Sequence, residues 1–564
     1  MRTNTAMLPH LLLAAVAGVL AAGMAVAPRA ARAAAPETIF TGRFLTLDRS
    51  HPRADAVAVF AGRIVAVGSR AEVEPLAGPD TRRISIPGVV FPGFADAHLH
   101  VAEIGEQLER LDVRGLTKAE VIEKVAQAAR TAPQGGWIFG EGWDQGFWHP
   151  AVFPSPGELD AVSRGHPVVL GRIDGHSVWV NSEVLARAGI SNDTPDPQGG
   201  HIMRDGAGRP TGVLVDNARE LLRRVMPKPT QADQERRIRA ALRQFARWGL
   251  TSVGDAGVDL PTIAIYKNLL RQKELPLRMY AMALGEEARA YYLANGPETD
   301  LGGGMLAVRS FKLFLDGALG SRGAEMTEPY SDAPREHGLE LISDAQLDVI
   351  VRAARQKGIQ VNVHAIGDRA VARALDAFQR AGVRPEDRFR VEHASVVADP
   401  DVLRFAKLGV IASIQPVFVG EYSRWAEDRV GPVRAHWVLR TADFVKAGVL
   451  LASGSDYPAS DSGTPIAALH CLVTRQGAAG TPKEGWHSDQ RVDTDQALRL
   501  LTAGPAYAEF KDKDLGMISV GRYADFTSLT ANPYEVPSND LRTLGIEMTV
   551  VAGQVIYQAG EHRH

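Results

Sequence analysis

The second half of the chain alternates between amphipathic stretches with helical spacing and short apolar runs. Residues 343–346 form a capping box, the predicted helix ends at Gly358, and an apolar strand follows over 359–364. A glycine also precedes each of the next three predicted strands. Repeated helix–strand units of this length predict a parallel sheet, and five or more in succession favour a closed (β/α)8 barrel of the TIM type.

The other barrel strands are expected upstream of these units. An apolar run ending at His98 gives the first strand, and runs near residues 251–254, 277–280 and 308–315 give strands two to four. The residues from about 101 to 240 then form a large insertion between the first two strands. Because insertions after barrel strands lie over the active-site mouth, we expect this one to shape the substrate pocket.

Strict alternation of apolar and polar residues marks both ends of the chain. Residues 55–60 and 63–68 read as a β-hairpin, and the segment after residue 514 shows the same pattern. Neither end has enough strands to bury a core alone. We therefore predict one small composite β-sandwich from residues 34–91 and 515–564, beside a barrel that spans 92–514 and includes the insertion.

The first residues have the pattern of an export signal. Arg2 is followed by an apolar run over residues 11–27 and by an Ala-x-Ala cleavage site near Ala33. This predicts a signal peptide over residues 1–33 and a periplasmic or secreted protein, without a stable membrane anchor after cleavage. A retained anchor is the alternative, but the run is rich in alanine and glycine and at the short limit for spanning a bilayer.

Composition narrows the function classes. The formal net charge is −3, from 63 basic and 66 acidic residues, so no overall basic field is present to bind nucleic acid. The single cysteine, Cys471, excludes an internal disulfide and reads as a buried apolar residue rather than a nucleophile. The expected partner is a small-molecule substrate, and a homo-oligomer is left open.

Five of the predicted strands end in residues that can bind a metal ion or carry a proton. His98 and His100 are two residues apart, so their imidazoles point to one face of an extended strand. A barrel builds its active site at the carboxyl ends of its strands, where such side chains would meet. The candidate ligands are His98, His100, Lys312, His364, His393 and Asp456.

Any single histidine of this set could be a core residue with satisfied ring nitrogens. Four inward imidazoles at strand ends would lack hydrogen-bond partners without an ion, so together they predict a metal site. Zinc is expected for imidazole and oxygen ligands, with nickel, manganese and iron as alternatives. The site would hold one or two divalent ions.

Lys312 lies in the apolar run Phe311–Leu315, where a buried ammonium is costly unless it is paired or loses its charge. Carbamylation by carbon dioxide would convert the amine into an anionic ligand that can bridge two metal ions. The alternative is an unmodified lysine that pairs with Asp316 or with a carboxylate across the barrel.

Five strings of the chain resemble the amidohydrolase superfamily. They are PGFADAHLH, SFKLFLDGALGSRGA, VNVHAIGDRA, RVEHAS and SGSDYP. Within the superfamily they are similar to the amidohydrolase 3 branch, the YtcJ-like or N-substituted formamide deformylase-like proteins. The resemblance runs from about residue 38 to the C-terminus. It implies the barrel with a composite β-sandwich, and it supports a carboxylysine at position 312.

The resulting hypothesis for the site has two metal ions. His98, His100 and Asp456 bind one ion, His364 and His393 bind the second, and carbamylated Lys312 lies between them. A site with one ion is the alternative. Asp456 would accept a proton from metal-activated water and return it to the departing nitrogen, so that an amide-like bond is hydrolysed.

The expected function is therefore a metal-dependent amidohydrolase that cleaves a non-peptide C–N bond of a small molecule. Hydrolysis of an ester, carbamate or phosphoester at the same site is an alternative, and a non-catalytic exported binding protein is another. His176 and Trp143 in the insertion, with Asp316, are candidates for substrate binding. Surface packing explains the tryptophan about as well, and Asp316 could equally fix a loop.

Overall fold

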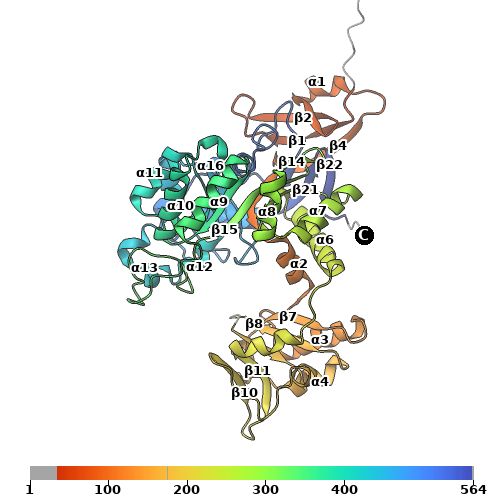
Figure 1. Ribbon diagram of the computed structural model, residues 1–564. Helices are drawn as coiled ribbons and strands as arrows, with labels where there is room; N and C mark the ends of the chain where they lie inside the picture. The colour runs from red at the N-terminus through yellow and green to blue at the C-terminus, as the bar shows by residue number, and fades with distance from the viewer. Residues whose placement is uncertain (1–34, 174–175, 562–564) are drawn as a thin grey trace, which may run out of the picture.

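The computed structural model describes residues 35–173 and 176–561 (Figure 1). The predicted signal peptide over residues 1–33 lies outside the described residues. Within the described part of the chain, no helix has the length and apolar character needed to cross a membrane.

Eight parallel strands form the barrel, as the sequence predicts. Along the sheet they run in the order β19-β18-β17-β16-β15-β13-β12-β5, with β14 (Glu298–Leu301) antiparallel to β15. The ends of this order approach each other, because the backbone N–H of Asp456, just after β19, donates to the carbonyl of His98 on β5 at 2.6 Å. The strands are β5 (Phe94–Leu99), β12 (Leu250–Val258), β13 (Arg278–Ala283), β15 (Leu306–Phe314), β16 (Gln360–Ala365), β17 (Arg390–His393), β18 (Ile411–Ile414) and β19 (Leu451–Ser453).

Helices follow the strands in chain order and bury apolar faces against them in one large core. The helix predicted from the capping box is present, since Ser343 accepts a hydrogen bond from the N–H of Gln346 at its start. The helices are α6 (Gln231–Arg247), α7 (Leu260–Gln272), α8 (Glu286–Asn295), α9 (Asp344–Gln356), α10 (Asp368–Arg380), α11 (Asp399–Leu408), α14 (Thr441–Lys446), α15 (Pro465–Thr474), α16 (Thr494–Leu500) and α17 (Ala503–Ala508).

The two ends of the chain meet in a second sheet of seven strands, in the order β22-β21-β20-β4-β1-β2-β3. Phe526 of β20 packs edge-on against Phe40 and Phe44 of β1. The prediction that both ends build one β-structure is thus confirmed. The strands are β1 (Thr38–Leu45), β2 (Arg53–Phe60), β3 (Arg63–Gly68), β4 (Arg82–Pro92), β20 (Phe526–Leu529), β21 (Ile546–Val551) and β22 (Gln554–Gln558).

The insertion forms a third sheet of six strands, in the order β10-β11-β9-β8-β7-β6. Its core contains Trp143, Trp148 and Trp179, whose ring centroids lie 5.7–6.3 Å apart. The elements are β6 (Leu111–Asp112), α3 (Lys118–Thr131), β7 (Ile138–Trp143), α4 (Pro156–Ser163), β8 (Val168–Arg172), β9 (Ser177–Val180), α5 (Ser182–Arg187), β10 (Gly200–Arg204) and β11 (Pro210–Asp216).

The position of the insertion differs from the expectation that it lies over the active-site mouth. Figure 1 shows the insertion standing away from the barrel, joined to it through α2 (Val101–Glu109) and α6. No described residue of the insertion lines the cavity at the barrel mouth. The physical reason is that the insertion buries its tryptophans in a core of its own and does not need the barrel surface for stability.

Candidate metal centre

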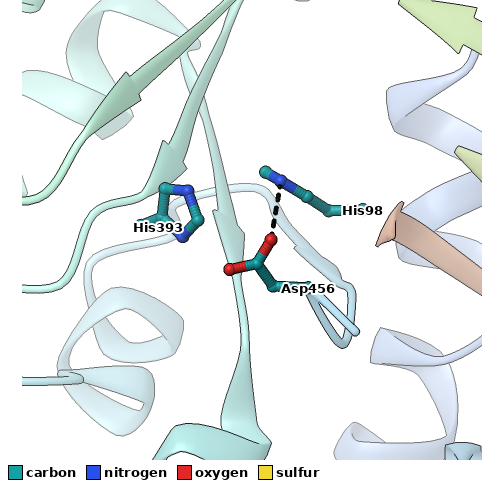
Figure 2. A group of neighbouring side chains, drawn as sticks. All are labelled: His98, His393 and Asp456. Carbon is teal, nitrogen blue, oxygen red and sulfur yellow. Dashed lines mark ion pairs between the residues drawn. The ribbon is translucent and has the colours of Figure 1, made fainter. Parts of the chain in front are cut away.

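The six predicted ligands converge at the carboxyl ends of the barrel strands. Figure 2 shows His98, His393 and Asp456, which come from separate elements and point toward one another. Their ligand atoms all lie within 4.8 Å of one another, and all three residues are buried. His98 is on β5, His393 ends β17, and Asp456 follows β19. Residues more than 350 positions apart in the chain are thus adjacent at one site.

The other three predicted ligands border this group. The Nε2 atom of His100 lies 3.0 Å from Oδ1 of Asp456, and Nζ of Lys312 lies 3.0 Å from Nε2 of His98. The rings of His364 and His393 have centroids 4.4 Å apart. All six side chains therefore belong to one cluster.

Backbone conformation sets the direction of two of these side chains. On β17, Arg390 and Glu392 point into the barrel and contact residues of β5, so simple alternation would turn His393 outward. His393 instead has φ of 73°, and Asp456 has φ of 58°. Non-glycine residues rarely adopt this left-handed conformation, and such strain is concentrated at functional sites.

The protonation states suit metal binding. Burial and the nearby Lys312 ammonium lower the pKa of His364 to about 3, and burial with the neighbouring His364 lowers the pKa of His393 well below its usual value. Both rings are thus neutral, which is the form that binds metal. Burial opposes ionisation of Asp456, but hydrogen bonds with His100 and His98 outweigh it and hold its pKa well below the ordinary value.

Lys312 has lost part of its tendency to carry charge. Its side chain is 1% exposed, and burial lowers its pKa to about 8 although the carboxylates of Glu392 and Asp456 act in the opposite direction. Asp316 does not pair with it, because the Asp316 carboxylate accepts backbone N–H groups of Glu325, Ile366 and Gly367. A substantial share of the amine is therefore neutral near pH 8.

A buried nitrogen without a hydrogen-bond partner indicates whether a metal ion fits this cluster. Among the described residues, the buried Nε2 of His364 has no hydrogen-bond partner, and the carboxylate oxygen of Asp316 is 3.5 Å away. Leaving a buried polar atom unsatisfied costs roughly 1–3 kcal/mol. A divalent ion would satisfy this nitrogen, and a set of imidazoles and carboxylate oxygens is the donor set that zinc and related ions prefer. The residues fit the ion.

Glu392 contacts a candidate metal ligand, and the sequence analysis did not assign it a role. Its Oε2 lies 2.6 Å from Nδ1 of His98, and its Oε1 lies 2.7 Å from Nε of Arg390. Burial opposes ionisation of Glu392, but the Arg390 guanidinium and the contact with His98 outweigh it and keep the pKa of Glu392 below the ordinary value. The sequence signal was available: Arg390 and Glu392 are two charges on one face of an otherwise apolar strand.

The cluster lies at the bottom of a cavity of about 470 Å³. Its walls come from the segments that follow β15, β16 and β18, and they are largely apolar and aromatic. A few polar groups at the base of an apolar pocket are typical of small-molecule sites. The apolar wall residues are Phe314, Ile366, Phe418, Tyr422 and Trp425.

The three residues proposed for substrate binding have other contacts. His176 lies on the insertion, largely exposed, with Nδ1 2.8 Å from a carboxylate oxygen of Asp216. Trp143 is fully buried and donates its indole N–H to the carbonyl of Leu170. Asp316 fixes the loops after β15 and β16 through the backbone hydrogen bonds described above. None of the three lines the cavity.

Comparison with known proteins shows the family of this chain. The profile of the amidohydrolase family matches residues 88–557. The chain belongs to the amidohydrolase family. It is 32% identical to the putative amidohydrolase YtcJ of Bacillus subtilis over 93% of this chain and 99% of that protein. It is 28% identical to the N-substituted formamide deformylase of Arthrobacter pascens over 92% and 98% of the two chains.

A solved structure agrees in fold. An uncharacterized metal-dependent hydrolase from Pyrococcus horikoshii is 28% identical and superposes with a TM-score of 0.72 over 89% of this chain and 99% of that one. The resemblance drawn from the sequence strings is thus confirmed at the level of the family. This amidohydrolase is a metal-dependent hydrolase with a TIM-type barrel.

Proposed function

We propose that this amidohydrolase cleaves a non-peptide C–N bond, of the amide type, in a small molecule. The observation that carries the proposal is the convergence of four imidazoles, a lysine and an ionised aspartate at the base of one apolar cavity. The formamide deformylase relative supports this bond type, because its name describes cleavage of an N-substituted formamide.

The proposed ligands divide between two ions. His98, His100 and Asp456 would hold one ion and His364 and His393 would hold the other, and Lys312, if carbamylated, would supply a ligand between them. Carbamylation requires a neutral amine, and the lowered pKa of Lys312 provides it. A single ion held by His98, His393 and Asp456 is the alternative, since their ligand atoms already lie within 4.8 Å of one another. Divalent ions, with zinc expected, supply Lewis acidity toward a substrate carbonyl and toward water.

The residues around the ions move and hold the protons. Asp456 is ionised, so it can accept a proton from the attacking water and pass it to the departing nitrogen. Although burial opposes protonation of His100, the adjacent Asp456 raises the pKa of His100, so this ring can support the charge changes on Asp456. Glu392 fixes the ring of His98 so that Nε2 faces the metal site.

A substrate panel tests the proposal. The zinc-loaded full chain is assayed with a formamide, a lactam, an N-acyl amine, an ester, a carbamate and a phosphoester. We expect turnover of at least one amide-type member and a fall in kcat of about 10²–10⁴-fold in Asp456→Asn. Asp399→Asn is the matched control, because Asp399 is an exposed carboxylate on α11 that pairs with Arg440.

Each outcome assigns a function. Turnover restricted to the ester, carbamate or phosphoester would replace the C–N assignment by the corresponding hydrolase. Binding without turnover of any member would favour a non-catalytic binding protein. An Asp456→Asn variant as fast as the parent would remove Asp456 from proton transfer.

We also propose that the mature enzyme acts in the periplasm or outside the cell after residues 1–33 are removed. The support is the apolar run and the Ala-x-Ala motif near Ala33. N-terminal sequencing of the enzyme from its native host tests this, and a retained Met1 would contradict it.

A further inference from the structure

The metal cavity contains a second carboxylate that the proposed chemistry does not use. Glu421 lies on α12 (Val419–Tyr422), which follows β18, and it lines the same cavity as His98 and Asp456. In the part of the chain that the structure describes, no hydrogen bond or ion pair holds its carboxylate. A half-buried carboxylate with no protein partner is available to a ligand.

Three aromatic rings line the same cavity as this carboxylate. The rings of Phe418 and Tyr422 are stacked with centroids 5.4 Å apart, and those of Tyr422 and Trp425 are 4.7 Å apart. All three residues line the cavity beside Glu421. Aromatic faces attract cations through their quadrupole, and a carboxylate attracts them through its charge. The combination selects a cationic group over a neutral group of the same shape.

The charges around Glu421 agree with this reading. Burial and the neighbouring Asp461 raise the pKa of Glu421, while the guanidinium of Arg424 opposes them. Burial also raises the pKa of Tyr422, and the carboxylates of Glu421 and Asp456 add to that effect. The Tyr422 phenol thus lies within electrostatic range of both Glu421 and the candidate metal ligand Asp456. A bound cation would offset the cost of keeping the Glu421 charge partly away from water.

The wall that carries these rings is held by contacts to the loop after β15. A Cβ atom on Gly320 would lie 3.3 Å from the indole of Trp425, so the bare glycine backbone packs directly on that ring. Arg429 donates to the carbonyl of Gly320 at 3.1 Å and pairs with Asp332. Asp332 also pairs with Arg322 of the same loop, with 2.9 Å between the charged atoms. The aromatic wall is therefore preformed rather than assembled by the ligand.

We propose that Glu421, Tyr422 and Trp425 form a subsite for a cationic nitrogen on the substrate. The substrate class is then an amide-type compound with a second, positively charged nitrogen away from the bond that is cleaved. This inference rests on the proposed function for the identity of that bond, whereas the subsite itself rests only on the cavity.

Binding of two isosteric probes tests the subsite. Choline carries a quaternary ammonium that cannot bind a metal ion, and 3,3-dimethylbutan-1-ol has the same shape and hydroxyl without the charge. We expect the metal-loaded full chain to bind choline about tenfold more tightly, as measured by calorimetric titration. Glu421→Gln should remove most of this preference while affinity for the alcohol stays within about twofold.

Two further variants sharpen the test. Trp425→Leu should also weaken choline more than the alcohol, because the cation–π face is lost while an apolar wall remains. Glu427→Gln is the matched control, since Glu427 is an exposed carboxylate on the neighbouring α13 (Ala426–Ala435) that does not line the cavity. Its preference for choline should equal that of the parent.

The outcomes separate this proposal from the proposed function. Equal affinity for the two probes, or a Glu421→Gln variant that keeps the preference, would overturn the cationic subsite even if neutral amides are hydrolysed. A choline preference that depends on Glu421, together with no turnover of any amide, would uphold the subsite and overturn the C–N assignment.

Discussion

The Nδ1 atom of His98 lies 2.6 Å from Oε2 of Glu392, and both side chains are completely buried. Arg390, also fully buried, holds the other carboxylate oxygen. This chain of three residues crosses the barrel from β17 to β5 beneath the metal site. It favours one tautomer of His98, with the proton on Nδ1 and the lone pair on Nε2, which lies 3.3 Å from Oδ1 of Asp456 and would be free to bind a metal ion.

The first prediction concerns this contact. Glu392→Gln should lower the affinity for zinc by about 10–100-fold, because the amide replaces the carboxylate that orients the His98 ring. Zinc content after dialysis against a graded chelator measures the affinity. Glu509→Gln is the control: Glu509 is another buried carboxylate, directly after α17, but it accepts a hydrogen bond from the Ser252 hydroxyl, and burial raises its pKa to about 7.

Two outcomes bear on the assignment of Glu392. If the two variants retain zinc equally well, Glu392 is no more than a structural partner of Arg390. If Glu392→Gln alone loses zinc, with unchanged melting temperature, the carboxylate acts through His98.

The second prediction concerns Lys312. If this lysine is carbamylated, reconstitution of the metal-free enzyme with zinc should depend on bicarbonate and should reach two ions per chain only when bicarbonate is present. The reason is that a neutral buried amine reacts with carbon dioxide, and burial lowers the pKa of this amine to about 8. Metal analysis gives the stoichiometry, and ¹³C NMR after labelling with ¹³C-bicarbonate detects the carbamate.

Lys312→Arg serves as the matched variant, because it keeps a cation but cannot form the carbamate. It should bind at most one zinc per chain at any bicarbonate concentration. Two ions per chain in that variant would remove Lys312 from the bridging position and leave the hydrolase with a different second site.

The sequence predicts the barrel well because each strand has its own local signal. All eight strands are found where the apolar runs predict them, several of them directly after a glycine that ends the preceding helix. The histidines stand out in the sequence as polar residues at the ends of those runs. The role of Glu392 depends on a contact with His98, which is 294 positions away, and nothing local encodes that pairing. The contacts of Asp316 are similarly hidden, since its partners are backbone N–H groups of its own loop and of the loop after β16.

The position of the insertion could not be predicted for a different reason. From the sequence, surface packing explains Trp143 and Trp179 about as well as a role in a substrate pocket does. The structure shows them packed against each other, with indole N–H groups donated to the backbone carbonyls of Leu170 and Ser155. The insertion supplies six strands of its own, which is enough to bury these rings in a core separate from the barrel.

The third prediction concerns the joint between the barrel and the terminal sheet. Arg278 of β13 and Asp525, just before β20, form a two-point ion pair with distances of 2.7 and 3.0 Å, and both side chains are 3% exposed. Asp525→Asn should lower the free energy of unfolding by about 3–5 kcal/mol, because it leaves a buried guanidinium without its counter-charge. Urea denaturation measures the change.

The exposed pair of Arg43 and Glu535 offers the control for this change. Both side chains are more than half exposed and screened by water, so Glu535→Gln should change the unfolding free energy far less than Asp525→Asn does. A loss in Asp525→Asn as small as that of the control would show that the joint is held by apolar contacts alone.

The last prediction contrasts two tryptophans in different parts of the molecule. Trp425 lines the metal cavity, whereas Trp143 is fully buried in the core of the insertion. Trp425→Leu should raise KM for a cleaved substrate several-fold with little change in melting temperature, because the ring contacts the ligand space. Trp143→Leu should lower stability by about 3 kcal/mol and leave KM close to that of the parent, because it opens a cavity in a core that no substrate reaches. If Trp143→Leu changes KM at temperatures where the variant is fully folded, the insertion takes part in substrate binding after all.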